Sequence, residues 1–572
     1  MHRYTLLSVL FIIISSAPNQ AQEQDGAPRP NIILIMSDDM GYSDLGCYGG
    51  EIPTPTLDAL AEKGLRYTQF YNTGRCCPTR ASLLTGLYAH QAGVGRMTKD
   101  DQLPGYRGEL SFRAVTLAEV LKPAGYATYM SGKWHVTSKL LQSESKHNWP
   151  RQRGFDRFYG TIIGAGSFFD PWTLTRDNVQ ITPENDPLYR PEVYHYTDAI
   201  ADNAVMFIND HAKSPEAQGL GKPFFLYVAF TAPHWPLHAL PEDIEQFEGD
   251  FPPEYDRFRQ ARFERMKQMG LIGADWELSP TVGDTAGVPE DRRAWEARCM
   301  EVYAAMILQM DRGIGRIVEA LKQTGAYENT LILYLHDNGG CHEGIGRVRW
   351  KSREGILPRD PMGADELQTN MIPEHSRVGL PVVMGTGVMP GPSETYHAYG
   401  WNWANVSNTP FRLHKSRVHE GGIATPLVAH WPAGIPTGDF GDHSAGLRHR
   451  VGHLIDIMPT AVELSGADYP QTFNGHDITP MEGRSLVPSF ATDEQIDRVL
   501  MWEHFGNAAI RHGQWKLVRV GLNGPWELYD MQADRTEMHD LSETMPDKAR
   551  ALAERWEAEA ERTLIYPLPT GR

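Results

Sequence analysis

Cysteine is scarce in this chain, with five among 572 residues, which is too few to hold a protein of this size together by disulfides. No apolar run after the N-terminal segment is long enough to predict a membrane-spanning helix. Basic residues are outnumbered, with 54 Lys and Arg against 72 Asp and Glu, and the net charge is -18. An acidic surface disfavours non-specific binding of DNA, RNA or anionic lipid. We therefore expect a globular protein with no nucleic-acid partner and no stable membrane insertion.

The N-terminus has the pattern of an export signal. His2 and Arg3 precede an apolar run from Leu6 to Ile14, and small and polar residues continue to Ala21. This order is typical of a secretory signal peptide. We predict a signal over residues 1–21 and an exported protein, periplasmic or secreted. A membrane anchor or a buried strand is the alternative for this segment.

Apolar runs alternate with helical patterns along most of the chain, above all a helical pattern over residues 302–324. A strand that is covered on both faces reads as a continuous apolar run. Four such runs are present: Asn31–Met36, Tyr126–Met130, Phe224–Phe230 and Leu331–Leu335. The alternation predicts an α/β fold, with a large, mostly parallel mixed sheet flanked by helices.

The end of the chain has a different pattern. From about residue 498, four short strand-like segments precede a charged amphipathic helix over Lys548–Arg562, which predicts a smaller α+β domain. We therefore divide the chain into a large domain over residues 28–497 and a C-terminal domain over 498–572. Residues 340–408 are rich in Gly, Pro and Trp, and we interpret them as an insertion in the large domain.

Polar, reactive side chains follow each of the four predicted strands. In chain order they are Asp38 and Asp39, then Lys133 and His135, then His234, and finally Asp337 and Asn338. Ligands of open α/β sheets bind beyond the carboxyl ends of the strands. Each of these residues taken alone is more simply a polar loop residue, but together they predict one site at that edge.

Cys76 and Cys77 stand at the start of a predicted helix. Pro78 suits the first turn, and the helix should run through Leu84 and end near Gly86. A helix N-terminus favours a thiolate. From these residues alone, Cys76 is either a nucleophile or one of a buried pair. The other three cysteines are interpreted as buried thiols, with one disulfide among them left open: Cys47, Cys299 and Cys341.

The segment Cys76-Cys-Pro-Thr-Arg80, followed by Ala-Ser-Leu-Leu-Thr-Gly86, resembles the signature of the formylglycine-dependent sulfatases of the alkaline phosphatase superfamily. The other reactive segments stand in the order typical of that family, and Lys415 precedes Glu420-Gly-Gly. Trp526-Glu-Leu-Tyr-Asp530 is similar to the family's C-terminal domain. The resemblance covers the chain after the signal and is closest to the bacterial arylsulfatases, which makes the large domain the catalytic one.

The resemblance implies that a formylglycine-generating maturation enzyme oxidises Cys76 to an aldehyde, formylglycine, whose hydrate attacks the sulfur. It also implies a bound Ca²⁺ ion. The implied metal ligands are Asp38, Asp39, residue 76 in its oxidised form, Asp337 and Asn338. Oxygen ligands of this kind suit Ca²⁺ or Mg²⁺, and the set lacks the His and Cys spacing of a zinc site.

The resemblance further implies catalytic roles for Cys76, Arg80, Lys133, His135, His234 and Lys415. Arg80 would orient residue 76, and Lys133 and Lys415 would neutralise sulfate oxygens. His135 would accept a proton from residue 76. His234, with Lys415, would protonate the leaving oxygen.

Three functions are compatible with these residues. The first is arylsulfatase-like hydrolysis of sulfate esters, on a sulfated small molecule or carbohydrate. The second is hydrolysis of phosphonate monoesters or phosphodiesters, since relatives with that activity share Cys-x-Pro-x-Arg. The third is non-catalytic binding of sulfated glycans, with Cys76 unmodified.

Two groups near the predicted site have two interpretations each. The basic residues around Lys415 suit a solvated loop or, as the alternative, substrate contact: Arg412, His414, Arg417 and His419. The aromatic residues of the insertion suit a pocket wall or packing against the core: Trp350, Tyr396, Tyr399, Trp401 and Trp403. Glu420-Gly421-Gly422 is interpreted as a structural turn.

Overall fold

The computed structural model describes residues 29–283, 287–347, 355–436 and 446–569. The predicted signal over residues 1–21 lies outside these ranges. Within them, an 11-stranded sheet has the order β10-β2-β9-β8-β1-β7-β3-β4-β5-β6, and β11 also pairs with β2. No helix in the described ranges is both long and apolar enough to cross a bilayer.

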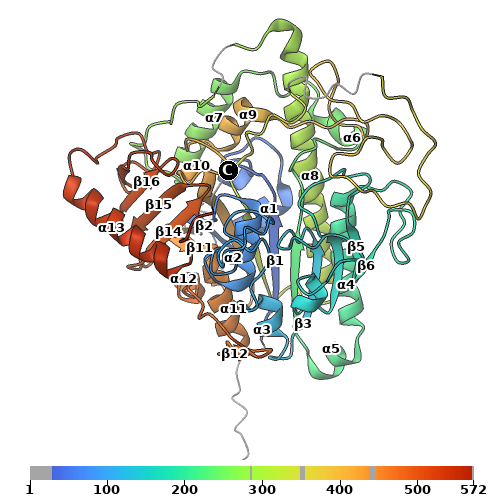
Figure 1. Ribbon diagram of the computed structural model, residues 1–572, viewed down its shortest axis with the longest axis horizontal. Coiled ribbons are helices and arrows are strands. Elements are labelled where there is room, and N and C mark those ends of the chain that lie inside the picture. Colours follow the sequence, from blue (N-terminus) through green and yellow to red (C-terminus); the bar gives the residue numbers. More distant parts are fainter. Residues whose placement is uncertain (1–28, 284–286, 348–354, 437–445, 570–572) are drawn as a thin grey trace, which may run out of the picture.

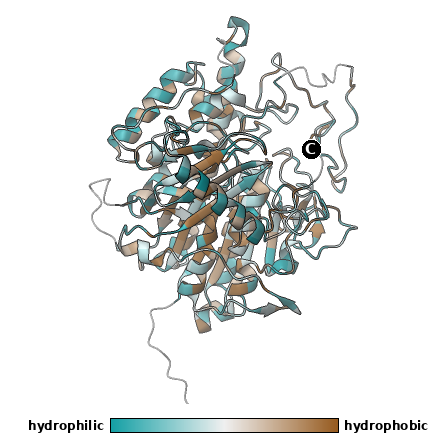
Figure 2. Cartoon of the chain, turned by 60° about the vertical axis from the view of Figure 1, so that its left-hand side comes forward, coloured by the Kyte–Doolittle hydropathy of each residue, from teal (hydrophilic) through white to brown (hydrophobic). Residues whose placement is uncertain are grey.

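The four predicted strands lie side by side at the centre of the sheet. They are β8 (Thr330–His336), β1 (Asn31–Ser37), β7 (Phe224–Ala229) and β3 (Ala127–Gly132), and all are parallel. Their side chains are almost all buried, and Figure 2 shows hydrophobic strands inside more hydrophilic helices. The prediction of a mostly parallel sheet is confirmed, and the carboxyl ends of these strands meet at one edge.

The flanks of the sheet make it mixed. On one side, β9 (Ala424–His430) runs antiparallel to β8, and β2 (Leu65–Tyr71) antiparallel to β9. On the other side, β4 (Arg157–Thr161) is parallel to β3, and β5 (Leu174–Arg176) is antiparallel to β4. The remaining strands of this sheet are short: β6 (Val179–Gln180), β10 (Leu447–Arg448) and β11 (Gly452–His453).

Two groups of helices flank the sheet (Figure 1). In one group α8 (Arg293–Gln323) packs on α4 (Tyr196–Ala212) and α1 (Pro55–Glu62). In the other, α11 (Ile457–Ser465) packs on α2 and α3. The helices not described elsewhere are α3 (Leu117–Leu121), α5 (Pro215–Leu220), α6 (Pro241–Ile244), α7 (Tyr255–Gln268), α9 (Gly400–Ser407) and α12 (Val487–Ala491).

The C-terminal region forms a separate antiparallel sheet, as predicted. Its strands are β14 (Val499–His504), β15 (Asn507–His512), β16 (Trp515–Arg519) and β17 (Glu527–Asp530), and α13 (Pro546–Arg562) packs on β15 and β16. Figure 1 shows this sheet beside β2 and β11. The division of the chain between residues 497 and 498 stays a prediction, and β14 begins directly after it.

A buried ion cluster joins this small sheet to the large one. Glu420, at the start of α10 (Glu420–Ile423), pairs with Lys516 on β16 at 2.8 Å and with Arg535 at 2.6 Å. Lys516 also pairs with Glu537 at 2.8 Å. All four side chains are buried. The Glu420-Gly-Gly segment therefore has a structural role, because it docks the C-terminal sheet.

Replacing Glu420 by Gln should lower the free energy of unfolding by about 3–5 kcal/mol, because the buried Arg535 loses its carboxylate partner and the buried Lys516 loses one of two. The pKa of Glu420 would be raised by burial alone, but Lys516 and Arg535 lower it to about 2 from 4.5. Its contribution to stability is complete above pH 4.5 and should be lost as the pH falls towards 2. Chemical denaturation across this window measures both effects.

A surface pair serves as the control. Glu254 pairs with Arg257 at 2.7 Å, and both side chains are largely exposed. Glu254→Gln should cost less than about 1 kcal/mol at any pH. Equal losses from the two variants would contradict a structural role for the buried cluster.

All five cysteines are buried and free, so the disulfide that the sequence left open is not formed in the described chain. The described parts of the insertion over residues 340–408 contain one helix, α9. Three of its aromatic residues are buried, and Trp403 packs on Tyr255 with ring centroids 4.8 Å apart. Packing is thus the correct interpretation for the buried residues, which are Tyr396, Tyr399 and Trp403. Trp350 lies outside the described residues.

Candidate active site

The carboxyl ends of β1 and β8 bring four oxygen-bearing side chains together. Asp38 and Asp39 follow β1, and Asp337 and Asn338 follow β8. Asn338 Nδ2 donates to Asp39 Oδ1 at 2.8 Å, and the Asp39 backbone N–H donates to Asp337 Oδ1 at 3.2 Å. Asp39 has a φ of 65°, a strained value for a residue other than glycine. All four side chains are buried, and together they form an oxygen cluster just beyond the strand ends.

The cluster has the chemistry of a site for a hard cation. Within the described chain, Asp38 Oδ1 and Asn338 Oδ1 are buried and have no hydrogen-bond partner. Burial, and the neighbouring Asp337, raise the pKa of Asp38 to about 7. Unsatisfied buried oxygens are costly unless a cation or a donor meets them. Carboxylate and amide oxygens are what Ca²⁺ and Mg²⁺ prefer, so the residues present fit such an ion.

Cys76 is the first residue of α2 (Cys76–Thr85), which ends at Gly86 with a φ of 68°, as predicted. The side chain of Cys76 is buried. Its thiol pKa lies well below the ordinary value chiefly because Cys77 donates a hydrogen bond to it; burial acts in the opposite direction, and Lys133 and His135 lower the pKa further. Cys77 Sγ lies 3.2 Å from His135 Nε2. Cys76 therefore sits in an electropositive pocket at a helix N-terminus.

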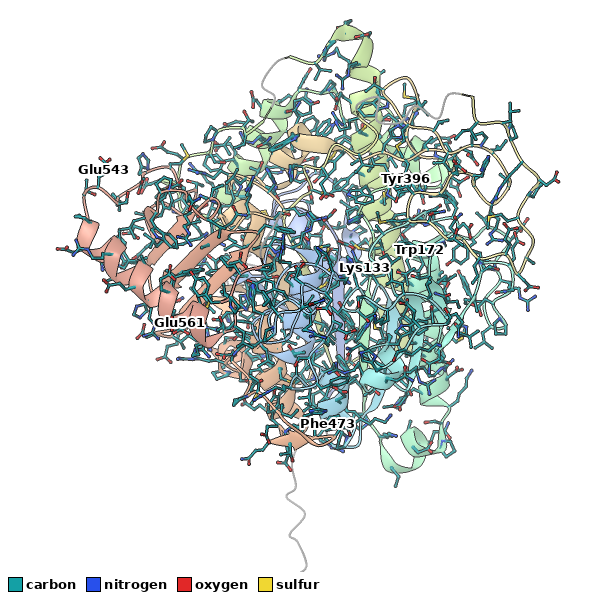
Figure 3. The ribbon with its side chains drawn as sticks, in the orientation of Figure 1. Lys133, Trp172, Tyr396, Phe473, Glu543 and Glu561 are labelled. Atoms are coloured by element: carbon teal, nitrogen blue, oxygen red, sulfur yellow. The ribbon has the colours of Figure 1, made fainter. Side chains whose placement is uncertain are left out.

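Arg80 lies one turn further along α2 and links this helix to the oxygen cluster. Its Nη2 lies 2.9 Å from Asp337 Oδ2 and 3.4 Å from Asp38 Oδ2. Lys133 Nζ also donates to Asp38, and the Arg80 Nη1 group donates to the Lys133 carbonyl at 3.1 Å. Figure 3 places Lys133 near the middle of the molecule. Two buried cations thus face the same carboxylates from the side of Cys76.

Lys415 and His234 contact the cluster at Asp39. Lys415 Nζ lies 2.6 Å from Asp39 Oδ1, and His234 Nε2 lies 3.3 Å from Asp39 Oδ2. The two nitrogens are 3.4 Å apart. Burial opposes the charge of Lys415, but Asp39 raises its pKa well above the ordinary value, whereas burial lowers the pKa of His234. At neutral pH, Lys415 is therefore the protonated member of this pair.

His135 is held in an unusual conformation beside Cys77. Its φ is 54°, and its Nδ1 is buried with no hydrogen-bond partner in the described residues. Burial lowers its pKa to about 4, so its imidazole is neutral at neutral pH. Gly164 faces the ring so closely that a Cβ at residue 164 would lie 2.0 Å from His135 Cε1. Gly164 thus makes room for the ring.

If His135 is the acid–base group that the sequence predicts, Gly164→Ala should displace its ring and lower kcat by on the order of 10²-fold. The backbone of Gly164 is not in the left-handed region, so any fall in the melting temperature would come from displacing the ring and not from backbone strain. Gly219→Ala on α5 is the control, because no atom lies within 4 Å of its added Cβ. A wild-type kcat in the Gly164 variant would contradict the tight contact.

The structure adds residues that no motif indicated. Glu343, from the insertion, pairs with Arg75 at 3.0 Å, lies 4.0 Å from Lys415 Nζ and accepts a hydrogen bond from Trp235 Nε1 at 2.7 Å. The Tyr227 hydroxyl on β7 accepts a hydrogen bond from Arg80 at 3.4 Å. A lone glutamate in an aperiodic loop carries no sequence signal, because its partners lie far away in the chain.

The interpretation of the residues around Lys415 as a solvated loop is wrong for most of them. His414 and His419 are buried, and Arg412 pairs with Glu527 of β17 at 3.3 Å. Arg412 and His419 both contact Glu527 of the C-terminal sheet, whereas His414 stacks on His342 of the insertion with ring centroids 3.5 Å apart. Arg417 is partly exposed and lines a cavity, where it donates to Asn507 Oδ1 on β15 at 3.1 Å.

Two family models match this chain. The sulfatase model matches residues 30–467, and the model for the C-terminal part of N-sulphoglucosamine sulphohydrolase matches residues 411–561. The chain belongs to the sulfatase family, in the alkaline phosphatase superfamily. This sulfatase is therefore an enzyme that hydrolyses sulfate esters, and the clustered residues at the strand ends form its candidate active site.

Two relatives match this chain over nearly their whole length. The sulfatase is 32% identical to the arylsulfatase of Klebsiella aerogenes, over 85% of this chain and 96% of that one. It is 31% identical to an uncharacterized sulfatase of Schizosaccharomyces pombe, over 96% and 95%. Among solved structures, Ps i-CgsB in complex with k-i-k-neocarrahexaose has a TM-score of 0.61 at 24% identity and covers 93% of each chain. That likeness confirms the fold.

Proposed function

We propose that this sulfatase is an arylsulfatase-like enzyme that uses formylglycine at position 76 and a bound Ca²⁺ ion. One observation carries the proposal. Arg80 lies one turn from Cys76 on α2 and contacts both Asp38 and Asp337, which places residue 76 beside the oxygen cluster. A nucleophile at a helix N-terminus and a hard-cation site thus share one buried pocket.

The proposed ligands of the ion are Asp38, Asp39, Asp337 and Asn338, with residue 76 as a further ligand. When bound, the ion supplies positive charge to the sulfate group and to the nucleophile. Three side-chain cations and three carboxylates balance one another here without it. With the Ca²⁺ ion bound, the pocket is moderately positive. Such a pocket favours a sulfate ester with one negative charge over a phosphate monoester with two.

The remaining side chains bind the sulfate group and orient the nucleophile. Once converted, residue 76 supplies an aldehyde hydrate whose hydroxyl is the nucleophile. Arg80 fixes its helix against the carboxylates, and Lys133 and Lys415 neutralise charge that grows on the sulfate oxygens. These cations are buried and held by ion pairs, so they need little reorganisation during the reaction.

Two proton positions follow from the geometry. The neutral His135, beside Cys77, accepts a proton from the side chain of residue 76. On the opposite side, the Lys415–His234 pair holds a proton at Nζ and delivers it to the leaving oxygen. His135 follows β3, and His234 of the acid pair follows β7, so the base and the acid come from different segments of the chain.

The maturation partner and the location remain part of the proposal. A formylglycine-generating enzyme is required if residue 76 is to carry the aldehyde, and the signal-like residues 1–21 support export. A sulfated carbohydrate is one substrate class to test. Solved structures that share the fold include Ps i-CgsB with k-i-k-neocarrahexaose and a protein in complex with D-glucosamine-2-N,6-O-disulfate.

The test uses the chain co-expressed with a formylglycine-generating enzyme, supplied with calcium and checked for the aldehyde by mass spectrometry. We expect faster release of nitrophenol from nitrophenyl sulfate than from nitrophenyl phosphate, and Cys76→Ser should lose turnover.

Preference for phosphate esters would instead favour the phosphonate hydrolase alternative. A phosphonate monoester hydrolase of Agrobacterium radiobacter shares the fold with a TM-score of 0.51 at 21% identity. Intact thiol at position 76 with glycan binding would favour a binder.

A further inference from the structure

A cavity of about 770 Å³ lies beside the candidate active site, where the two sheets meet. Its inner wall includes Arg75, which precedes Cys76, and Ser416, which follows Lys415; their side chains are 2.7 Å apart. Its outer wall comes from the β14–β15 hairpin and from Leu522. A volume of this size is typical of a pocket for a substrate with several rings or groups. The cavity is thus placed to hold the part of the substrate beyond the sulfate.

The cavity presents a cation whose charge is not neutralised. Arg75 is paired with Glu343 at 3.0 Å, and Arg96 with Asp101 at 3.3 Å. Arg417 donates to the neutral Asn507 at 3.1 Å, and among the described residues no ion pair joins it to a carboxylate. The carboxylate of Glu503 also lines the cavity. It is already engaged by His90 at 2.8 Å and by the Gly506 N–H at 2.7 Å.

The hairpin tip presents an exposed aromatic ring at a strained position. Phe505 and Gly506 form the two-residue turn between β14 and β15, with φ values of 51° and 84°. Such turns favour Asn, Asp or Gly at both positions, and a phenylalanine there is costly. The ring is 41% exposed, lines the cavity and lies 4.9 Å from the Arg96 guanidinium. The ring also packs on His504 with centroids 4.2 Å apart, and its exposed part is open to a ligand in the cavity.

We propose that this cavity binds a second anionic group of the substrate on Arg417 and seats an adjoining sugar ring on Phe505. The substrate class is then an acidic saccharide that carries a carboxylate or another sulfate beside the scissile ester. This inference rests on the proposed function, because it concerns the leaving group of the same reaction. It assigns specificity to the C-terminal hairpin.

The experiment uses the matured, calcium-loaded enzyme and monosulfated disaccharides that contain a uronic acid, each as the free carboxylate and as its methyl ester. Release of inorganic sulfate gives kcat/KM for each. The free acid should be hydrolysed about tenfold faster than the ester, because a hydrogen-bonded charge pair is lost in the ester. Arg417→Gln should bring this ratio close to one. Arg484→Gln, at an exposed arginine outside the cavity, should leave the ratio unchanged.

The Phe505→Asn variant distinguishes a role of this side chain in substrate binding from a role in folding. Asparagine suits the turn, so the melting temperature should stay equal or rise, while KM for the disaccharide acid should increase several-fold and kcat should change less. A phenylalanine with a purely structural role would give a lower melting temperature and an unchanged KM.

Nitrophenyl sulfate distinguishes the two levels of failure. If aldehyde-bearing enzyme hydrolyses neither it nor any disaccharide, the proposed function fails. If it hydrolyses nitrophenyl sulfate but no disaccharide, or treats acid and ester alike, the cavity assignment is overturned and the sulfatase mechanism stands. A ratio that persists in Arg417→Gln overturns it as well.

Discussion

Cys76→Ala should lower the rate of sulfate release by on the order of 10³-fold or more, because the proposed nucleophile is lost while the surrounding cations remain. The variant should fold normally, since alanine is smaller and suits a helix. Steady-state release of nitrophenol from nitrophenyl sulfate measures the effect, with both proteins produced beside the maturation enzyme. Circular dichroism melting checks the fold.

Cys47→Ala provides the matched control for this prediction. Cys47 is likewise a buried free thiol, but it lies near Asp58 and Arg66, away from the catalytic cluster. Its loss should leave kcat within about twofold, as is usual for a small change at a remote site. If Cys76→Ala retained a similar rate, residue 76 would not be the nucleophile.

Calcium should stabilise the folded enzyme, and Asp38→Asn should abolish this effect. An ion at about 100 times its Kd adds roughly 2.7 kcal/mol to the free energy of unfolding, which the wild-type protein should show as a higher melting temperature. In the variant a ligand is lost, and sulfate release should fall on the order of 10²-fold or more. Calorimetry after chelation, with and without added calcium, measures the first effect.

Asp44→Asn distinguishes a lost ligand from a lost buried charge. Asp44 is also buried and pairs with Arg262 at 2.6 Å, outside the oxygen cluster. This variant should melt at a lower temperature whether or not calcium is present, but it should keep the calcium-dependent shift. A calcium shift that survives in Asp38→Asn would remove Asp38 from the metal site.

The centre of the fold could be predicted because its signals are local. β1, β3, β7 and β8 are continuous apolar runs, and each is followed directly by its reactive residues. Parallel strands necessarily bring those residues to one edge, so the clustering of Asp38, Lys133, His234 and Asp337 followed from topology alone. The helix at Cys76 was also local, since Pro78 and Gly86 mark its start and end.

The rest depends on partners that are distant in the chain. Glu343 was missed because its contacts with Arg75 and Lys415 form only when the insertion folds over the site. His419 contacts Glu527 of the C-terminal sheet and His414 stacks on His342 of the insertion, and a basic sequence pattern reveals neither contact. The positive φ values of Asp39 and His135 are imposed by tertiary contacts on residues that would otherwise avoid them.

The docking of the C-terminal sheet also sets an order of events in time. Trp502 Nε1 on β14 donates to the carbonyl of Asn72, just before Cys76, across 430 residues of sequence, and only 2% of Cys76 is exposed once the chain has folded. At typical rates of synthesis, about 5–20 residues per second, Trp502 emerges roughly 20–90 s after Asn72. If residue 76 is converted to formylglycine as proposed, the maturation enzyme has this interval in which to reach Cys76 before the C-terminal sheet docks. Pulse-chase mass spectrometry should therefore find that conversion of thiol precursor falls steeply if the enzyme is supplied only after the chain is complete, and equal conversion of folded precursor would contradict the inference. Docking of the last strands of the chain thus limits the time during which Cys76 is accessible.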